Sequence, residues 1–183
     1  MRAFLAIDLP EPVLEALETL QDDLRVGRIM DPGTLHLTLA FLGEQPESMI
    51  AEVHQALTGL DTFTFDLTVQ GLGTFGSRQP AVLWAGIAPQ PALTALRDRV
   101  RRLVRGAGLE LQRERFRPHV TLARIRRGLR HGELVELQRF LTDHAAFAVE
   151  PFQVDRVTLF QSILSPDGAR HEVLAEYPLR HAG

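Results

Sequence analysis

Two short segments of the chain share the order histidine, apolar residue, threonine, leucine. The first, His-Leu-Thr-Leu, begins at His36, and the second, His-Val-Thr-Leu, begins at His119. In a β-strand, residues two positions apart point to the same face, so Thr38 lies beside His36 and Thr121 lies beside His119. The pattern therefore predicts two matching faces, each with one imidazole and one hydroxyl group.

These residue types suit the transfer of protons around a phosphate. An imidazole has an unperturbed pKa of about 6.5, so it acts as a base or as an acid near neutral pH. Two imidazoles on opposite sides of a reacting atom can deprotonate a nucleophile and protonate a leaving group in one step. Threonine hydroxyls can donate to the nonbridging oxygens, which carry the negative charge. A single histidine on a strand is usually structural, but two in matched contexts favour catalysis.

Composition removes several other kinds of chemistry. The chain of 183 residues has no cysteine, which excludes thiolate nucleophiles, disulfides and cysteine-ligated zinc. No histidine has the spacing of a metal ligand, so we expect neither a metal nor a cofactor. The apolar run at the N-terminus is interrupted by Asp8 and Pro10, and no segment approaches the roughly 18 to 20 apolar residues of a membrane span. We therefore expect a cytoplasmic protein, and we separately expect it to be a monomer.

Charge is unevenly distributed along the chain. The net charge is −3, yet residues 97–130 contain twelve arginines and only three acidic residues. Basic segments attract polyanions even in acidic proteins. Three of the arginines recur at every fourth residue, as on the solvated face of a helix: Arg97, Arg101 and Arg105. Three others alternate along an expected strand that leads to His119, and are predicted to point one way: Arg113, Arg115 and Arg117.

The two motifs must be positioned by an ordered set of elements. Apolar periodicity predicts helices over residues 10–24, 46–60, 90–108 and 131–144. It predicts strands over residues 1–9, 34–42, 62–70 and 80–88, around His119, and over 152–164 and 169–179. The third and fourth strands should pair through a loop from Gly73 to Gln79, and the last two through a turn at residues 165–168. The Gly-x-Gly-x-x-Gly run at 71–76 is not followed by a helix, so it is not a dinucleotide site.

The order helix, histidine strand, helix, strand, strand occurs twice. We expect a single domain over residues 1–183, with pseudo-repeat halves over roughly 10–89 and 90–178. A pseudo-twofold axis between the halves would bring the two His-Thr faces together across one cleft. The remaining histidines are expected on the surface: His54, His131, His144, His171 and His181. Phe75 and Trp84 are expected in the core.

Three segments carry a resemblance to a known family: HLTLAFLGE, RPHVTLAR and the tail VTLFQSILSPDGARHEVLAEYPL. They resemble the RNA 2′,3′-cyclic phosphodiesterases of the two-histidine phosphoesterase superfamily, also called 2′-5′ RNA ligases. The resemblance implies an α+β, bilobal fold with antiparallel sheets around a central cleft. It also implies metal-independent hydrolysis of a 2′,3′-cyclic phosphate at an RNA end to a 2′-phosphomonoester.

The resemblance further implies roles for individual residues. By position, His119 is the base that activates water and His36 is the acid that protonates the departing 3′-oxygen. Two threonines and one arginine correspond to phosphate-binding residues: Thr38, Thr121 and Arg124. Phe41 corresponds to an aromatic residue beside the terminal nucleobase. Phe41 and Arg124 each lie five positions after their histidine, so they reach its face only if the strand twists, bulges or ends before them.

Three other functions remain open at this level. The same two histidines can catalyse the reverse reaction, which joins a cyclic phosphate end to a 5′-hydroxyl in a 2′-5′ linkage. A noncatalytic RNA-binding module would use the basic segment, but it has no need of two proton-transfer groups. A different cyclic phosphate, such as one on ADP-ribose, would suit the same chemistry.

Overall fold

The structure, a computed structural model, describes residues 1–76, 79–165 and 168–181. Within these ranges four α-helices occur close to their predicted positions: α1 (Glu11–Asp22), α2 (Glu47–Leu57), α3 (Pro91–Gly106) and α4 (His131–Asp143). Their starts follow from local sequence. Proline occupies the first turn of α1 and begins α3, and the Glu133 side chain accepts a hydrogen bond from the Arg130 backbone N–H at the start of α4. No helix in the described part of the chain is both long and apolar enough to cross a membrane.

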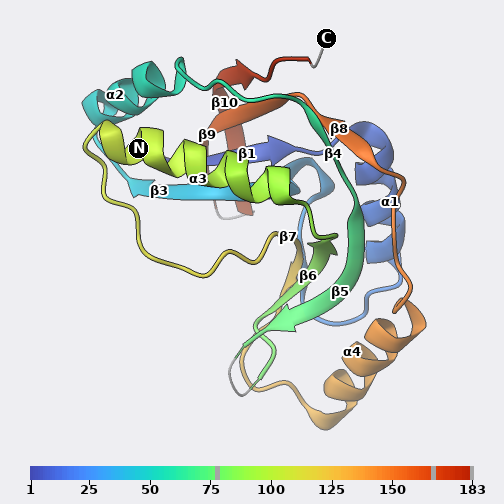
Figure 1. The fold of residues 1–183 in the computed structure, drawn as a ribbon. Coiled ribbons are helices and arrows are strands. Elements are labelled where there is room, and N and C mark those ends of the chain that lie inside the picture. The colour runs from blue at the N-terminus through green and yellow to red at the C-terminus, as the bar shows by residue number, and fades with distance from the viewer. Residues whose placement is uncertain (77–78, 166–167, 182–183) are drawn as a thin grey trace.

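The strands form one large antiparallel sheet and one small one (Figure 1). The large sheet has the order β10 (Gly168–Pro178), β9 (Arg156–Ser165), β1 (Arg2–Asp8), β3 (His36–Glu44), β7 (His119–Arg124), β6 (Val82–Ile87) and β5 (Val69–Phe75). The short β2 (Arg28–Ile29) also pairs with β7, and a 3₁₀ turn, η1 (Pro32–Thr34), precedes β3. β4 (Phe65–Leu67) and β8 (Phe152–Val154) pair separately. The predicted α+β class with antiparallel sheets is confirmed.

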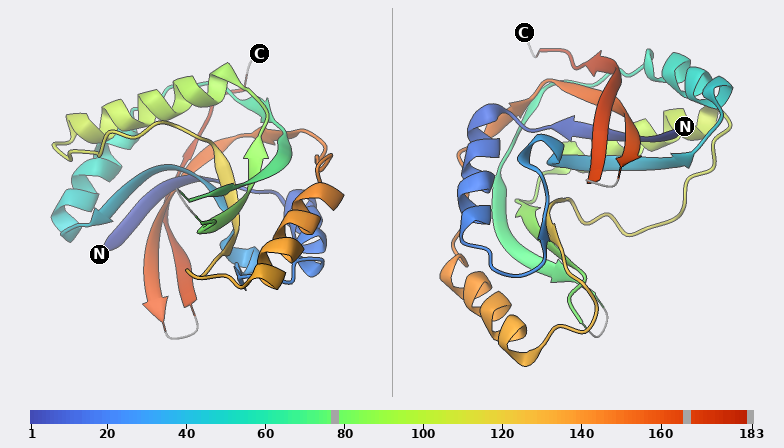
Figure 2. Two further views of the ribbon diagram at one scale, coloured as in Figure 1. Left: turned by 90° about the horizontal axis from the view of Figure 1, so that it is seen from below. Right: turned by 180° about the vertical axis from the view of Figure 1, so that it is seen from behind.

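The order of elements along the chain does not match their order in space. Strands β5 and β6 come from the first part of the sequence, yet they continue the sheet beyond β7, whereas the late strands β9 and β10 continue it beyond β1 and β3. Two of the helices, α1 and α3, cross over in the same way (Figures 1 and 2). α3 packs against both α2 and β3, while Gln21 of α1 donates a hydrogen bond to the Leu122 carbonyl of β7 at 2.9 Å.

The two parts of the large sheet meet at β3 and β7. One residue pair is in register between these strands, Leu37 with Val120, and both side chains are fully buried. On either side of this pair the strands diverge, because each is held more extensively by its outer neighbour, β1 or β6. Both histidine motifs therefore lie where β3 and β7 join the two parts of the sheet.

The prediction of one strand over residues 62–70 is wrong. The segment 62–70 divides into β4 and β5, and β5 continues through the glycine-rich run to Phe75, so the loop begins later than expected. Gly73 pairs with Trp84 of β6, and only glycine fits there, since a side chain would overlap the Trp84 ring. The turn predicted at 165–168 includes residues 166–167, which lie outside the described residues.

The segment before His119 is also not a strand, because residues 109–118 have no regular structure. Its backbone is held by side chains of α3 instead of by a sheet: the Arg101 guanidinium donates to the Gln112 carbonyl at 2.5 Å. The helix arginines differ from prediction as well. Arg97 and Arg101 are not solvated but only 6% and 5% exposed, and both form an ion pair with Glu114 of this segment.

Candidate active site

One registered pair determines which way both motifs face. Directly opposed residues of an antiparallel ladder point to the same side of the sheet, so Leu37 and Val120 enter the same core. Their neighbours in sequence must then point to the other side. We call the residues that share this side the HxT face: His36, Thr38, His119 and Thr121. All four are half-buried, and two strands more than 80 residues apart in sequence bring them together.

A β-bulge brings Phe41 to the HxT face. In the pairing of β1 with β3, Ala6 faces Thr38 and Leu5 faces Ala40, so Leu39 is an extra residue. Leu39 and Ala40 are consecutive yet both are buried, and the next side chain, Phe41, is 61% exposed. Ring contacts confirm its side of the sheet, since Phe41 lies 6.2 Å from the Phe4 ring, which itself lies 4.6 Å from the His36 ring.

The same bulge recurs on β7. Thr121 pairs with Trp84 and Ala123 pairs with Leu83, which leaves Leu122 as the extra residue. Leu122 and Ala123 are both buried, and Arg124 after them is exposed. After the bulge, side chains again alternate between the two sides of the sheet. Arg124 therefore points to the same side as Thr121, just as Phe41 points to the same side as Thr38 on β3. Phe41 and Arg124 could reach the face of their histidine only if the strands were irregular, and both strands have the required bulge.

Both histidines are oriented by the same backbone contact. His36 Nδ1 lies 2.7 Å from the Thr34 carbonyl oxygen, and His119 Nδ1 lies 2.6 Å from the Arg117 carbonyl oxygen. A carbonyl can only accept, so Nδ1 carries the proton in each ring. In the neutral tautomer this leaves Nε2 with its lone pair, available to exchange a proton with a substrate.

His36 lies in an aromatic environment. Its ring is 4.6 Å from Phe4, 6.4 Å from Phe160 and 5.0 Å from His171, with the last contact edge-on. Burial lowers the pKa of His36 to about 4; the hydrogen bond to Thr34 opposes this shift, and the charges of His171 and His119 add to it. The effect of His119 shows that the two imidazoles of the HxT face are within electrostatic reach. In the free protein His36 is therefore neutral at pH 7.

His171 was not predicted at this site. It was expected on the surface, but it lies half-buried against His36, and burial lowers its pKa. Its position follows from the β9–β10 pairing, which sets His171 opposite Ser162, two residues after Phe160. Only the tail motif, ARHE, was an indication in the sequence.

His119 also has an aromatic support. The Phe75 ring is 4.7 Å away and nearly perpendicular, and the Trp84 ring is 6.4 Å away. Both aromatic residues were expected in the core, but they are half-exposed and flank this histidine. Arg117 places its guanidinium carbon 6.0 Å from the centre of the Phe75 ring. Each histidine therefore packs beside aromatic rings, and within the described residues its hydrogen bond to the protein is made through Nδ1.

The structure provides no metal-binding cluster among the described residues, and two arginines of the basic segment, Arg126 and Arg113, are paired or lie away from the HxT face. Among the residues that the structure describes, no three histidine, aspartate or glutamate side chains are grouped so as to hold a metal ion. Arg126, close to the HxT motif of β7, forms a two-pronged ion pair with Glu133, with both distances 2.8 Å. Arg113 lies near α3, where it lines a separate pocket.

Comparisons with a family model and with individual proteins both indicate the same family. A family model described as the 2′-5′ RNA ligase superfamily matches residues 9–163. An RNA 2′,3′-cyclic phosphodiesterase of Aeropyrum pernix is 32% identical over 85% of this chain and 88% of its own length. One of Thermotoga maritima is 31% identical over 96% of this chain and 94% of its own.

Solved structures share the fold over almost the full length. The crystal structure of TT0787 from Thermus thermophilus covers all of both chains with a TM-score of 0.79 and 27% identity. A structure of E. coli LigT in complex with phosphate covers 97% of this chain and 96% of that chain with a TM-score of 0.72 and 25% identity.

Proposed function

The chain belongs to the 2′-5′ RNA ligase superfamily, and from this we propose that it hydrolyses the 2′,3′-cyclic phosphate at an RNA end to a 2′-phosphomonoester. The observation that carries the proposal is the pair of half-buried imidazoles on one face. Each is fixed through Nδ1, and each leaves Nε2 free for a proton. All of the proposed catalytic groups come from one chain, so a monomer suffices.

The proposed reaction moves two protons and exchanges two bonds. His119 Nε2 takes a proton from water, and the water oxygen attacks the phosphorus atom. The bond from phosphorus to the 3′-oxygen breaks, and His36 Nε2 gives a proton to that oxygen, which leaves the phosphate on the 2′-oxygen. The hydroxyls of Thr38 and Thr121 donate to the nonbridging oxygens, whose negative charge they stabilise.

The acid role requires a proton that His36 does not hold in the free protein, because its pKa is about 4. The substrate itself supplies the reason for protonation. An anionic phosphate beside an imidazole favours the charged imidazolium and raises its pKa. We propose that His36 gains its proton as the cyclic phosphate binds, so that an acid is present only when there is a leaving group to protonate.

Two further residues are proposed to bind the ends of the substrate. Arg124, at the bulge of β7, would add a guanidinium to the phosphate oxygens, which Arg binds through paired hydrogen bonds. Phe41, at the matching bulge of β3, exposes a ring that suits stacking on the terminal base. In this proposal the charge contact and the stacking contact come from residues at equivalent positions of the two strands.

The name of the family supports a second activity of the same site. The reverse reaction uses a 5′-hydroxyl in place of water and joins two RNA ends in a 2′-5′ linkage. Water at about 55 M favours hydrolysis unless the two ends are held together. Adding an RNA with a 5′-hydroxyl end to the reaction tests this directly, since ligation gives a longer product.

The test uses an RNA oligonucleotide with a 2′,3′-cyclic phosphate end, and the product is compared with 2′-phosphate and 3′-phosphate standards. We expect a 2′-phosphate product, and a loss of about a hundredfold or more in His36→Ala and in His119→Ala. His131→Ala, which removes an exposed histidine, is the matched control. Near-native activity in either HxT variant, or a 3′-phosphate product, contradicts the proposal.

A further inference from the structure

A basic pocket lies beside α3, away from the HxT face. It has a volume of about 400 Å³ and is lined by five arginines and two acidic residues, Asp98 and Glu114; we call it the α3 pocket. A second hollow of about 810 Å³ adjoins it and shares Arg105 and Arg113. The lining of the α3 pocket therefore has a surplus of three positive charges.

Two of the arginines already have a partner. Glu114 Oε1 lies 3.2 Å from Arg97 Nη2 and 3.7 Å from Arg101 Nη1, and both arginines are buried. The Arg97 guanidinium also stacks over the Phe116 ring at 4.4 Å. These contacts fasten residues 112–116 to α3. One carboxylate serves two guanidinium groups, so a positive charge is left over even here.

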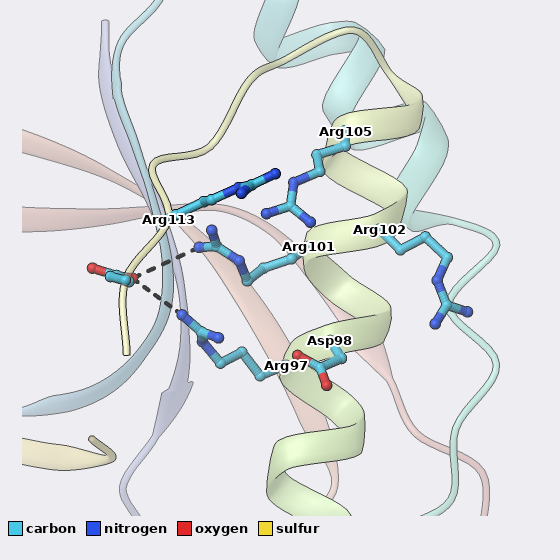
Figure 3. A pocket seen from close by; sticks show the side chains of 7 residues that line it. Arg97, Asp98, Arg101, Arg102, Arg105 and Arg113 are labelled. Atoms are coloured by element: carbon cyan, nitrogen blue, oxygen red, sulfur yellow. Dashed lines mark hydrogen bonds and ion pairs between the residues drawn. The ribbon is translucent and has the colours of Figure 1, made fainter. Parts of the chain in front are cut away.

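The other arginines at the centre of the pocket have no such partner. Arg105 and Arg113 are exposed and form no ion pair within the described part of the chain. Figure 3 shows the guanidinium groups of Arg101, Arg105 and Arg113 turned toward one another. Burial lowers the pKa of Arg101, and the charges of Arg97 and Arg105 lower it further.

Three guanidinium groups that face one another repel, and an anion between them removes the repulsion. Guanidinium is the side chain group best matched to phosphate oxygens, because its planar fork donates two parallel hydrogen bonds. We propose that the α3 pocket is a second anion site, which binds a phosphate group through Arg101, Arg105 and Arg113. The phosphate belongs either to the RNA chain beyond its cyclic end or to a free oligophosphate.

This phosphate is not the reacting one. α3 packs against β3 on the side that carries Leu37, whereas the HxT face lies on the other side of that strand. The α3 pocket and the HxT face are therefore separated by the sheet. Binding in the pocket does not depend on the proposed catalytic activity, and only the RNA source of the phosphate rests on it.

The first experiment measures the binding of inorganic tripolyphosphate by calorimetry. The pocket variant is Arg105→Gln/Arg113→Gln, and the matched control is Arg99→Gln/Arg139→Gln, which loses the same two charges outside the pocket. We expect one binding event to weaken by at least about tenfold in the pocket variant and to change by less than about twofold in the control. Equal affinities in the two variants, or no binding to the wild type, overturn the proposal. Thermal unfolding confirms that each variant is folded.

The second experiment identifies the source of the phosphate. If it is the RNA chain, the pocket variant binds a long cyclic-phosphate oligonucleotide more weakly but processes a cyclic mononucleotide at the wild-type rate. If it is a free oligophosphate, only tripolyphosphate binding weakens. Both results support an anion site. A wild type that binds tripolyphosphate through the pocket but hydrolyses no cyclic phosphate would refute the proposed function alone.

Discussion

The burial of His36 should make the free energy of unfolding depend on pH. We expect that lowering the pH from about 7.5 to about 5 destabilises the wild-type protein by about 2 kcal/mol more than it destabilises His36→Asn. Asparagine is the chosen replacement because its side-chain N–H₂ can take the place of Nδ1–H and donate to the Thr34 carbonyl, but it does not titrate.

The sign follows from where the proton binds. The pKa of His36 is about 4 in the folded protein and 6.5 when unperturbed, so between these values the unfolded chain binds a proton that the folded protein does not. Stability is therefore full above pH 6.5 and falls as the pH drops toward 4. At about pH 5 the unfolded histidine is almost fully protonated while the folded one is mostly neutral, which gives the difference of about 2 kcal/mol.

The assay is urea unfolding at both pH values, with extrapolation to water, for the wild type, His36→Asn and the exposed-histidine control His131→Asn. Burial also lowers the pKa of His171 and raises that of Asp8, but both groups remain in every variant and largely cancel in the comparison. If His36→Asn and His131→Asn lose as much stability as the wild type, His36 is not desolvated as the structure indicates.

Three further outcomes are expected. Hydrolysis of a cyclic phosphate should persist in EDTA, and a complete loss that one divalent ion restores would show that a metal takes part. Gly73→Ala should cost about 1–3 kcal/mol in thermal unfolding because its methyl group meets the Trp84 ring, whereas Gly132→Ala, which meets nothing within 4 Å, should cost nothing; equal effects would argue against this packing. Arg124→Ala should slow the reaction of a cyclic mononucleotide and of a long RNA alike, and Arg115→Ala should weaken mainly the long RNA in a salt-dependent way; equal salt slopes for both substrates would exclude a role for the basic segment.

The HxT face could be predicted because its cause is local. The two-residue period of a strand places each threonine beside its histidine, whatever the rest of the fold does. The positions of Phe41 and Arg124 depend on the bulges, and the sequence indicated only that some irregularity was needed. The repeated Leu-Ala pairs, at Leu39 and again at Leu122, were the available signal, since two consecutive buried residues break the alternation.

The remaining errors arise from long-range contacts. The pairing of Leu37 with Val120 joins residues that no local pattern connects. The contact of His171 with His36 likewise joins two distant strands. β10 is at the edge of the sheet, and β9 and β1 lie between it and β3. Arg97 and Arg101 follow the spacing of a solvated helix face, and only the return of Glu114 over α3 buries them.

The exchange of strands between the two parts of the sheet has a consequence for how the chain can be divided. A cut between residues 89 and 90 would separate β1 from its partner β9, and would separate β7 from its partners β3 and β6. Each fragment would then expose unpaired strand edges and half of a core, which favours association with any complementary edge. The two fragments should therefore be insoluble when produced apart and should assemble when produced together. The molecule behaves in this respect as an obligate heterodimer whose subunits happen to be joined by a peptide bond.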